Sequence, residues 1–157
     1  SRRLLDRAAA DLAATDLPIA GDWRMLPRVA LRLTWVRTEW GLYSGNVDIA
    51  REGAARAAEQ AWALPSPRHA MKTQLIVAAT AAATGRLDAA AAVGSAAHAT
   101  AGELGLLPLQ WAAATLLAGV TGKDVYQREV VDLRTRLARR GMSLLPLEPG
   151  ERLASIR

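Results

Sequence analysis

Three short glycine-containing segments recur along the chain at nearly constant spacing, and each is typical of a tight turn between two helices. The first two are near copies, GNVDIA starting at Gly45 and GRLDAA starting at Gly85. A weaker copy, GKDV, starts at Gly122. Glycine readily adopts the left-handed conformation that ends a helix, because it has no Cβ atom. The recurrence therefore predicts a chain of repeated helical hairpins.

Leucine–proline pairs precede each hairpin, at residues 26–27, 64–65 and 107–108. Proline suits the first turn of a helix, where its missing N–H would have had no partner. Hairpins that repeat at this spacing are typical of an α-solenoid, in which each hairpin buries its apolar face against the next. We expect an all-α stack of about three antiparallel hairpins, with a leading helix and an irregular C-terminal tail. The expected hairpins span roughly residues 27–64, 65–105 and 107–141 of a single domain that covers residues 1–157.

The composition fits this prediction. Apolar residues make up 51% of the 157 residues, and phenylalanine is absent, so small Ala, Leu and Val side chains must form the core. The absence of cysteine excludes disulfides and thiolate chemistry. No apolar run reaches the roughly 18 residues of a membrane span, and we expect a cytoplasmic protein without a membrane partner. Because the sequence begins at Ser1, we also expect it to be a fragment of a longer chain.

The charge pattern disfavours binding to nucleic acid. The net charge of +5 is modest, and the basic excess lies near the two ends of the sequence. The arginine-rich run of residues 134–140 closely follows two acidic residues, Glu129 and Asp132. Arginine is also favoured near the C-terminus of a helix, so we interpret this run as a solvated helix face. A nucleic-acid binder usually carries a denser basic stripe with base-reading side chains within it.

The two turn motifs resemble those of the tetratricopeptide repeat (TPR), where a glycine, a polar residue, an apolar residue and a later alanine recur. Ala57 and Ala97 match the next small position of that family. The sequence departs from the pattern at Thr38, which stands where the second unit has Ala78, and at Gln127, which replaces the packing alanine of the third unit. Its period is also longer than that of the family. The resemblance covers roughly residues 27–140 and is closest to long-period repeats of bacterial signalling and transcription-regulatory proteins.

The resemblance implies a concave groove, lined by the first helix of each hairpin, that binds a partner. Arg28 and Arg32 lie four residues apart on one face of the first such helix, and this cationic and aromatic patch suits a carboxylate or an acidic peptide. The alternative is a helix face that forms an ion pair with the next hairpin. Counted back from Gly45 and Gly85, and with Arg28 added, the candidate binding residues are Arg28, Arg32, Trp35, Glu39, Tyr43, Lys72 and Leu75.

Tryptophans allow both packing and binding roles. Trp40 lies on an apolar stripe with Val29, Leu33, Val36 and Tyr43, at steps of three and four residues, which predicts the buried face of that helix. Trp35 lies on another side of the same helix, where packing and groove binding both remain open. Trp62 and Trp111 lie near the Leu-Pro turns, and we expect them to fill space between hairpins.

No catalytic or metal-binding pattern is present in the sequence, and we expect neither an enzyme nor a cofactor. His69 is expected to be exposed, and His98 to be packed among alanines; neither has a carboxylate three or four residues away. No nucleophile elbow or phosphate-binding loop occurs. The leading hypothesis is a protein-interaction or scaffold module of a bacterial regulatory protein. The alternative is a small-ligand sensor domain of a transcription regulator. The partner, the oligomeric state and the occupancy of the groove by residues 144–147 stay open.

Overall fold

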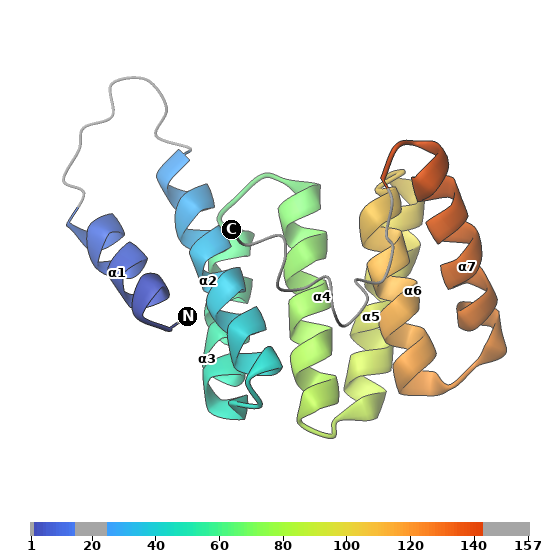
Figure 1. Cartoon of the computed structure of the whole chain (residues 1–157), viewed down its shortest axis with the longest axis horizontal. Helices are drawn as coiled ribbons and strands as arrows, with labels where there is room; N and C mark the ends of the chain where they lie inside the picture. The colour runs from blue at the N-terminus through green and yellow to red at the C-terminus, as the bar shows by residue number, and fades with distance from the viewer. Residues whose placement is uncertain (1, 15–24, 143–157) are drawn as a thin grey trace, which may run out of the picture.

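The computed structural model describes residues 2–14 and 25–142, and this part of the chain contains seven helices and no strand (Figure 1). The all-α stack of hairpins is confirmed. The leading helix α1 precedes three hairpins, α2–α3, α4–α5 and α6–α7. Their bounds are α1 Arg2–Ala13, α2 Met25–Tyr43, α3 Val47–Trp62, α4 Pro67–Ala83, α5 Leu87–Glu103, α6 Leu107–Thr121 and α7 Asp124–Arg139. The expected irregular tail lies outside the described residues.

The first helices of the hairpins form one row and the second helices another. Helices that follow one another pack together, and α4 also adjoins both α2 and α6. In the described part of the chain the backbones of α3, α5 and α7 do not adjoin one another. Figure 1 shows α2, α4 and α6 side by side, with α3 and α5 behind them. The α2–α4–α6 row is therefore the inner surface of the stack, where neighbouring hairpins are closest.

Small residues form the buried faces of the second helices of the first two hairpins. On α3 the buried residues are Ala50, Ala54, Ala57 and Ala61, and on α5 they are Ala90, Gly94, Ala97 and Ala101. The α5 face packs on both neighbours, since Ala97 meets Leu75 of α4 and Ala113 of α6. The two sets correspond position by position, at the same offset that separates the turn glycines Gly45 and Gly85. Because alanine and glycine project little beyond the backbone, the paired helices can approach closely.

The third hairpin departs from this register because its turn has a different geometry. The turns after α2 and α4 are each closed by a backbone hydrogen bond between residues five positions apart. The Asn46 N–H donates to the Gly41 carbonyl at 2.8 Å, and the Arg86 N–H donates to the Ala81 carbonyl at 2.9 Å. Gly122 instead bonds the Ala118 carbonyl at 3.0 Å, and the next N–H bonds the hydroxyl of Thr121. The residues of α7 that are buried are Leu133 and Leu137, which follow Ala97 and Ala101 at a shorter offset than the one between the first two hairpins.

The buried face of α2 is not the apolar stripe that the sequence predicts. Val29 and Val36 are 44% and 48% exposed, and Tyr43 is 87% exposed. Leu33 and Trp40 are half-buried, whereas Leu31, Thr34, Thr38 and Gly41 are buried. The threonines tolerate burial because each hydroxyl donates to a carbonyl four residues back, from Thr34 to Ala30 at 3.1 Å and from Thr38 to Thr34 at 2.8 Å.

Trp62 is also misplaced by the sequence prediction, since it is 94% exposed on α3 and fills no space between hairpins. Trp111 packs within the third hairpin and not between hairpins, against a cluster of α6 and α7 that includes Leu107, Leu133 and Leu137. Among the described residues, no helix has both the length and the apolar character that crossing a bilayer requires.

Helix α1 packs loosely on the end of the stack. No residue of α1 is buried, and a cavity of about 460 Å³ lies between α1 and the α2–α3 hairpin. The Arg37 guanidinium of α2 donates to the Asp6 carboxylate of α1 at 2.6 Å, an exposed ion pair that adds little to the stability of this contact.

A threonine and a glycine fit together where α2 crosses α3. A Cβ added at Gly53 would overlap the hydroxyl of Thr38 and would lie 3.1 Å from the Thr38 Cβ. In the second hairpin the equivalent pair is Ala78 and Val93, in which the larger side chain comes from the second helix. The departure of Thr38 from the small residue of the TPR pattern is thus compensated by Gly53.

We expect Gly53→Ala to lower the free energy of unfolding by about 1–2 kcal/mol, because the overlap costs more than the roughly 1 kcal/mol gained by removing a helical glycine. Urea unfolding followed by circular dichroism measures this change. Gly119→Ala is the matched control, since nothing lies within 4 Å of the added Cβ, and it should stabilise the protein. Thr38→Ala should restore part of the loss in the double variant. Equal effects of the two glycine substitutions would contradict the proposed fit.

Candidate functional site

A depression of about 430 Å³ lies on the inner row of helices, over the junction of α2 and α4. Side chains from all three first helices line it. They are Arg32 and Trp35 from α2, Arg68, His69 and Lys72 from α4, and Leu109 from α6. Three of the candidate residues that the sequence places on these helices, Arg32, Trp35 and Lys72, therefore meet around one surface feature.

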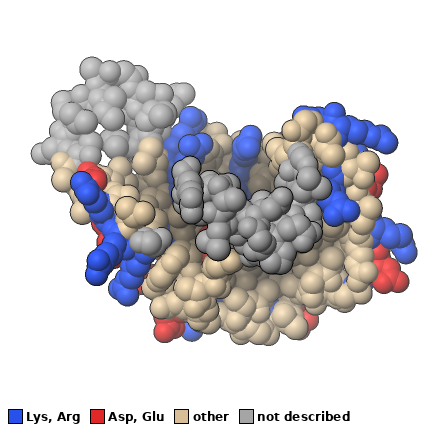
Figure 2. Space-filling view, in the orientation of Figure 1, with Lys and Arg blue, Asp and Glu red and all other residues tan. Residues whose placement is uncertain are grey.

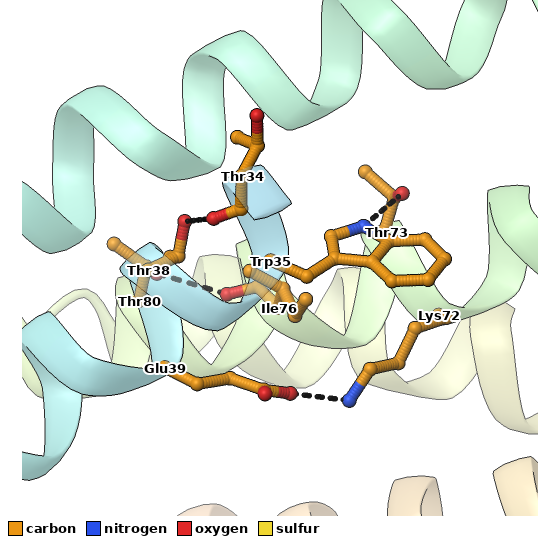
Figure 3. A network of polar contacts seen from close by, with 8 residues as sticks. All are labelled: Thr34, Trp35, Thr38, Glu39, Lys72, Thr73, Ile76 and Thr80. Atoms are coloured by element: carbon orange, nitrogen blue, oxygen red, sulfur yellow. Dashed lines mark hydrogen bonds and ion pairs between the residues drawn. The ribbon is translucent and has the colours of Figure 1, made fainter. Parts of the chain in front are cut away.

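Trp35 occupies the centre of this site and is held on two sides. Its indole Nε1 donates to the hydroxyl of Thr73 at 3.0 Å, and Figure 3 shows the side chain reaching from α2 across to α4. The indole also stacks on the imidazole of His69, with ring centroids 5.4 Å apart and planes inclined by 25°. Packing and binding are thus compatible roles for Trp35, because its contacts to α4 also fix it beside the depression.

His69 is fixed by the start of its own helix. Its Nδ1 lies 2.6 Å from the hydroxyl of Ser66, the residue that precedes α4. That hydroxyl makes no capping bond to the helix, so it is available to hold the imidazole ring. The sequence prediction of an exposed His69 is wrong, since the residue is half-buried against Trp35.

The site concentrates positive charge. Burial lowers the pKa of His69, and the guanidinium groups of Arg28, Arg32 and Arg68 lower it further because they disfavour another positive charge. Among the described residues none of these three arginines forms an ion pair. Figure 2 shows basic side chains on the upper edge of the molecule, over α2 and α4. An anion at this position would be attracted by all three of these arginines.

One acidic residue does approach the site, but it has a partner. The Lys72 ammonium of α4 donates to the Glu39 carboxylate of α2, as Figure 3 shows. The two side chains are 37% and 45% exposed, so the pair contributes little to stability. Its effect on the site is to neutralise Glu39 and to link α2 with α4. Among the described residues the arginines therefore remain as the charges without an ion-pair partner.

The remaining candidates occupy different positions. Leu75 is buried beneath the site, in a cluster with Ala97 and Ala113 against which Leu109 packs. It therefore supports the floor of the depression and does not face a ligand directly. Tyr43 is not among the residues that line the depression and lies at the end of α2.

Sequence reasoning missed Arg68 and His69 as parts of the site, although a signal for Arg68 exists. The offset between Gly45 and Gly85 also relates Arg28 to Arg68 and Arg32 to Lys72. Two basic residues four apart thus occur at the same positions of consecutive first helices. Arg32, Arg68 and Lys72 line the depression, whereas the candidate Arg28 is half-buried and does not line it, although its charge acts on His69. No spacing in the sequence predicts the stacking of Trp35 on His69.

A second polar cluster links the last three helices. His98 Nε2 of α5 lies 2.8 Å from the Glu129 carboxylate of α7, to which Gln110 of α6 also donates at 3.2 Å. Tyr126 meets the His98 ring edge-on at 6.0 Å. The described residues contain no group of three or more His, Cys, Asp or Glu side chains that could hold a metal ion. We interpret this cluster as a link between helices.

Comparisons with protein-family models, curated proteins and solved structures found no match for this chain. The site must therefore be interpreted from its own geometry and charge.

The protonation of His69 provides a direct test of the charge arrangement. We expect the pKa of His69 to lie below the ordinary value of 6.5 and to rise when Arg28 and Arg32 are both changed to glutamine. NMR titration of the histidine ring protons measures it, and His69→Gln assigns the resonance. A pKa at or above 6.5 in the unchanged protein would contradict the arrangement.

The same shift predicts a pH dependence of stability. The folded pKa is lowered, so the unfolded chain binds more protons at His69 between the folded value and 6.5. Stability should therefore fall as the pH drops from about 6.5 toward the folded pKa, and His69→Gln should weaken this dependence. Urea unfolding at several pH values compares the two proteins, and an unchanged dependence in His69→Gln would exclude His69 as its source.

Proposed function

We propose that this chain is a TPR-like protein-interaction module that docks a peptide or a helix of a partner along α2, α4 and α6. The observation that carries the proposal is the site around Trp35: a fixed aromatic ring surrounded by arginines that have no ion-pair partner among the described residues. Aromatic and arginine side chains are the residues that most often dominate the binding energy of protein interfaces.

The row of first helices also supports an extended ligand. Helix α6 has no charged residue, and its Leu109, Ala112 and Leu116 are half-buried. Leu109 and Ala112 pack against the cluster around Leu75, which continues the surface from the Trp35 site across α4. The face thus offers a charged aromatic part and an adjoining apolar part, an arrangement that suits a segment of polypeptide.

A small-ligand sensor is the second candidate, and two features favour it. A volume of about 430 Å³ is within the roughly 300–1,000 Å³ of small-molecule sites. The Trp35–Thr73 and Glu39–Lys72 contacts link the first two hairpins, so a ligand that broke them would change how these hairpins pack. Against this candidate, Arg32 and Arg68 are exposed and the depression is open, whereas small-molecule sites usually enclose most of the ligand.

The module assignment further implies a role within a larger bacterial regulatory protein, as scaffold or as a contact between domains. This context follows from the likeness of the turn motifs to TPR repeats in such proteins. The turns at Gly45 and Gly85 and the buried alanine faces of α3 and α5 support the likeness.

We expect peptides selected from a random library against this protein to bind at least about tenfold more weakly to Trp35→Ala and Arg32→Ala, because these changes remove the anchor and a charge. Fluorescence anisotropy measures the affinity. Trp62→Ala is the matched control, since this tryptophan is exposed on the outer helix α3 and should leave binding unchanged. Binding that survives both groove substitutions would exclude this site. Stabilisation by small molecules without any peptide binding would favour the sensor.

A further inference from the structure

We propose that the segment docked at this site is acidic at one end and apolar at the other, with its carboxylates held between the arginines of α2 and α4 and its apolar side chains on α6. The inference rests on the proposed function and names the chemistry of the partner. It further assigns His69 as the residue through which binding of the acidic end responds to pH.

Within the described residues, the arginines around His69 carry charge that no ion pair compensates. Arg28 and Arg32 of α2 and Arg68 of α4 surround the imidazole of His69, and each of them disfavours its protonation. Like charges on adjacent helix faces destabilise the folded chain, and the one acid described near the site, Glu39, is already paired with Lys72. Carboxylates of a ligand would supply the missing partners, because a guanidinium group can bind a carboxylate through two parallel hydrogen bonds.

The distribution of charge on this surface favours a peptide over a nucleic acid. A phosphodiester backbone carries a charge at every unit and requires basic residues along its whole path. Beyond the arginines this surface continues onto α6, which has no basic residue between Leu107 and Thr121. Its surface there consists of small and apolar side chains such as Leu109, Ala112 and Leu116. A polypeptide can match this change from charged to apolar surface within a few residues, because each of its residues can carry a different side chain.

The positions of the charged and apolar side chains also set the orientation of the ligand. Trp35 is fixed by Thr73 and His69, so little conformational entropy is lost when a ligand packs against the ring. It lines the depression together with Arg32 and Arg68, which lie on α2 and α4, and with Leu109 of α6. The acidic end of the ligand should therefore lie over the start of α4 and the apolar end over α6.

Binding of an acidic ligand is coupled to the protonation of His69. The charged groups that face His69 are Arg28 and Arg32 from α2 together with Arg68 from its own helix, whereas α6 presents the uncharged Leu109. Lys72, also on α4, is engaged by Glu39. An added carboxylate would offset the arginines and favour the protonated imidazole, so binding should take up a proton. Affinity for an acidic ligand should consequently increase as the pH falls through the range in which His69 titrates.

The test uses two fluorescein-labelled peptides, each with one half of leucine and alanine. The other half is glutamate in the first peptide and glutamine in the second. We expect the glutamate peptide to bind at least about tenfold more tightly than the glutamine peptide, and the difference to shrink in high salt. Lowering the pH from about 7.5 to about 5.5, where glutamate stays ionised, should tighten its binding to the unchanged protein but not to His69→Gln.

Charge reversal provides the matched variant. Arg32→Glu and Arg68→Glu together should abolish binding of the glutamate peptide and create binding of a third peptide, in which lysine replaces glutamate. Both arginines are exposed, so the fold should persist, and circular dichroism checks it. Arg134→Glu and Arg139→Glu on α7 are the control and should have no such effect, since these residues are exposed on the helix at the far end of the stack.

The outcomes separate this inference from the proposed function. Library-selected peptides that require Trp35 but lack acidic residues would overturn the inference and leave the docking function intact. No peptide binding at the site would overturn both. Tighter binding of single-stranded oligonucleotides than of the glutamate peptide, lost on the same charge reversal, would assign the site to phosphate and overturn the acidic peptide. An equal response to pH in His69→Gln would remove His69 from the assignment.

Discussion

The structure depends on the small buried residues of α3 and α5, which let these helices pack closely against their neighbours. Ala50, Ala54, Ala57 and Ala61 in α3, and their equivalents in α5, leave little side-chain volume to keep adjacent helices apart. Close approach is favourable because apolar surface is buried and densely packed. It also fixes the rotation of α2 and α4, so that the opposite side of each faces the inner surface. The position of Trp35 and of the arginines is thus a consequence of where alanine and glycine occur.

The repeat was predictable from the sequence because glycine turns and alanine spacing are local signals that the structure uses directly. The buried face of α2 was not predictable, because threonine is a polar residue that a hydrophobic pattern does not count. Thr34 and Thr38 can nevertheless be buried, since each hydroxyl donates to a carbonyl of the preceding turn. The stripe of Val29 and Val36 has the right period but lies on the wrong side of the helix. The third hairpin could not be aligned reliably with the first two, because the turn at Gly122 has different hydrogen bonds. The presence of a glycine in the sequence does not distinguish these two kinds of turn.

Some features of the candidate site were likewise predictable from the sequence, and others were not. Arg32, Trp35 and Lys72 follow from the register of the repeat, and Arg68 was accessible from the repeat spacing that relates it to Arg28. The side-chain contacts were not accessible. The bond from Trp35 to Thr73, the stacking on His69 and the ion pair of Glu39 with Lys72 each join α2 to α4, between residues far apart in the sequence. Such contacts depend on side-chain rotamers and on the distance between neighbouring hairpins, and the spacing of residues in the sequence predicts neither.

The repeat itself explains why charge accumulates here. A stack of similar hairpins places equivalent residues of consecutive units side by side, so a basic pair at one register becomes a basic cluster when the next unit carries it too. Elsewhere in the described chain, several exposed charges have a partner within their own helix, as Arg136 has in Asp132. Arg28, Arg32 and Arg68 have no such partner among the described residues and instead act together on His69. Opposite charge can occupy neighbouring first helices, as Glu39 and Lys72 show. A cluster of arginines without an ion-pair partner among the described residues, beside a fixed tryptophan, therefore supports the proposal of a ligand that brings the missing charge.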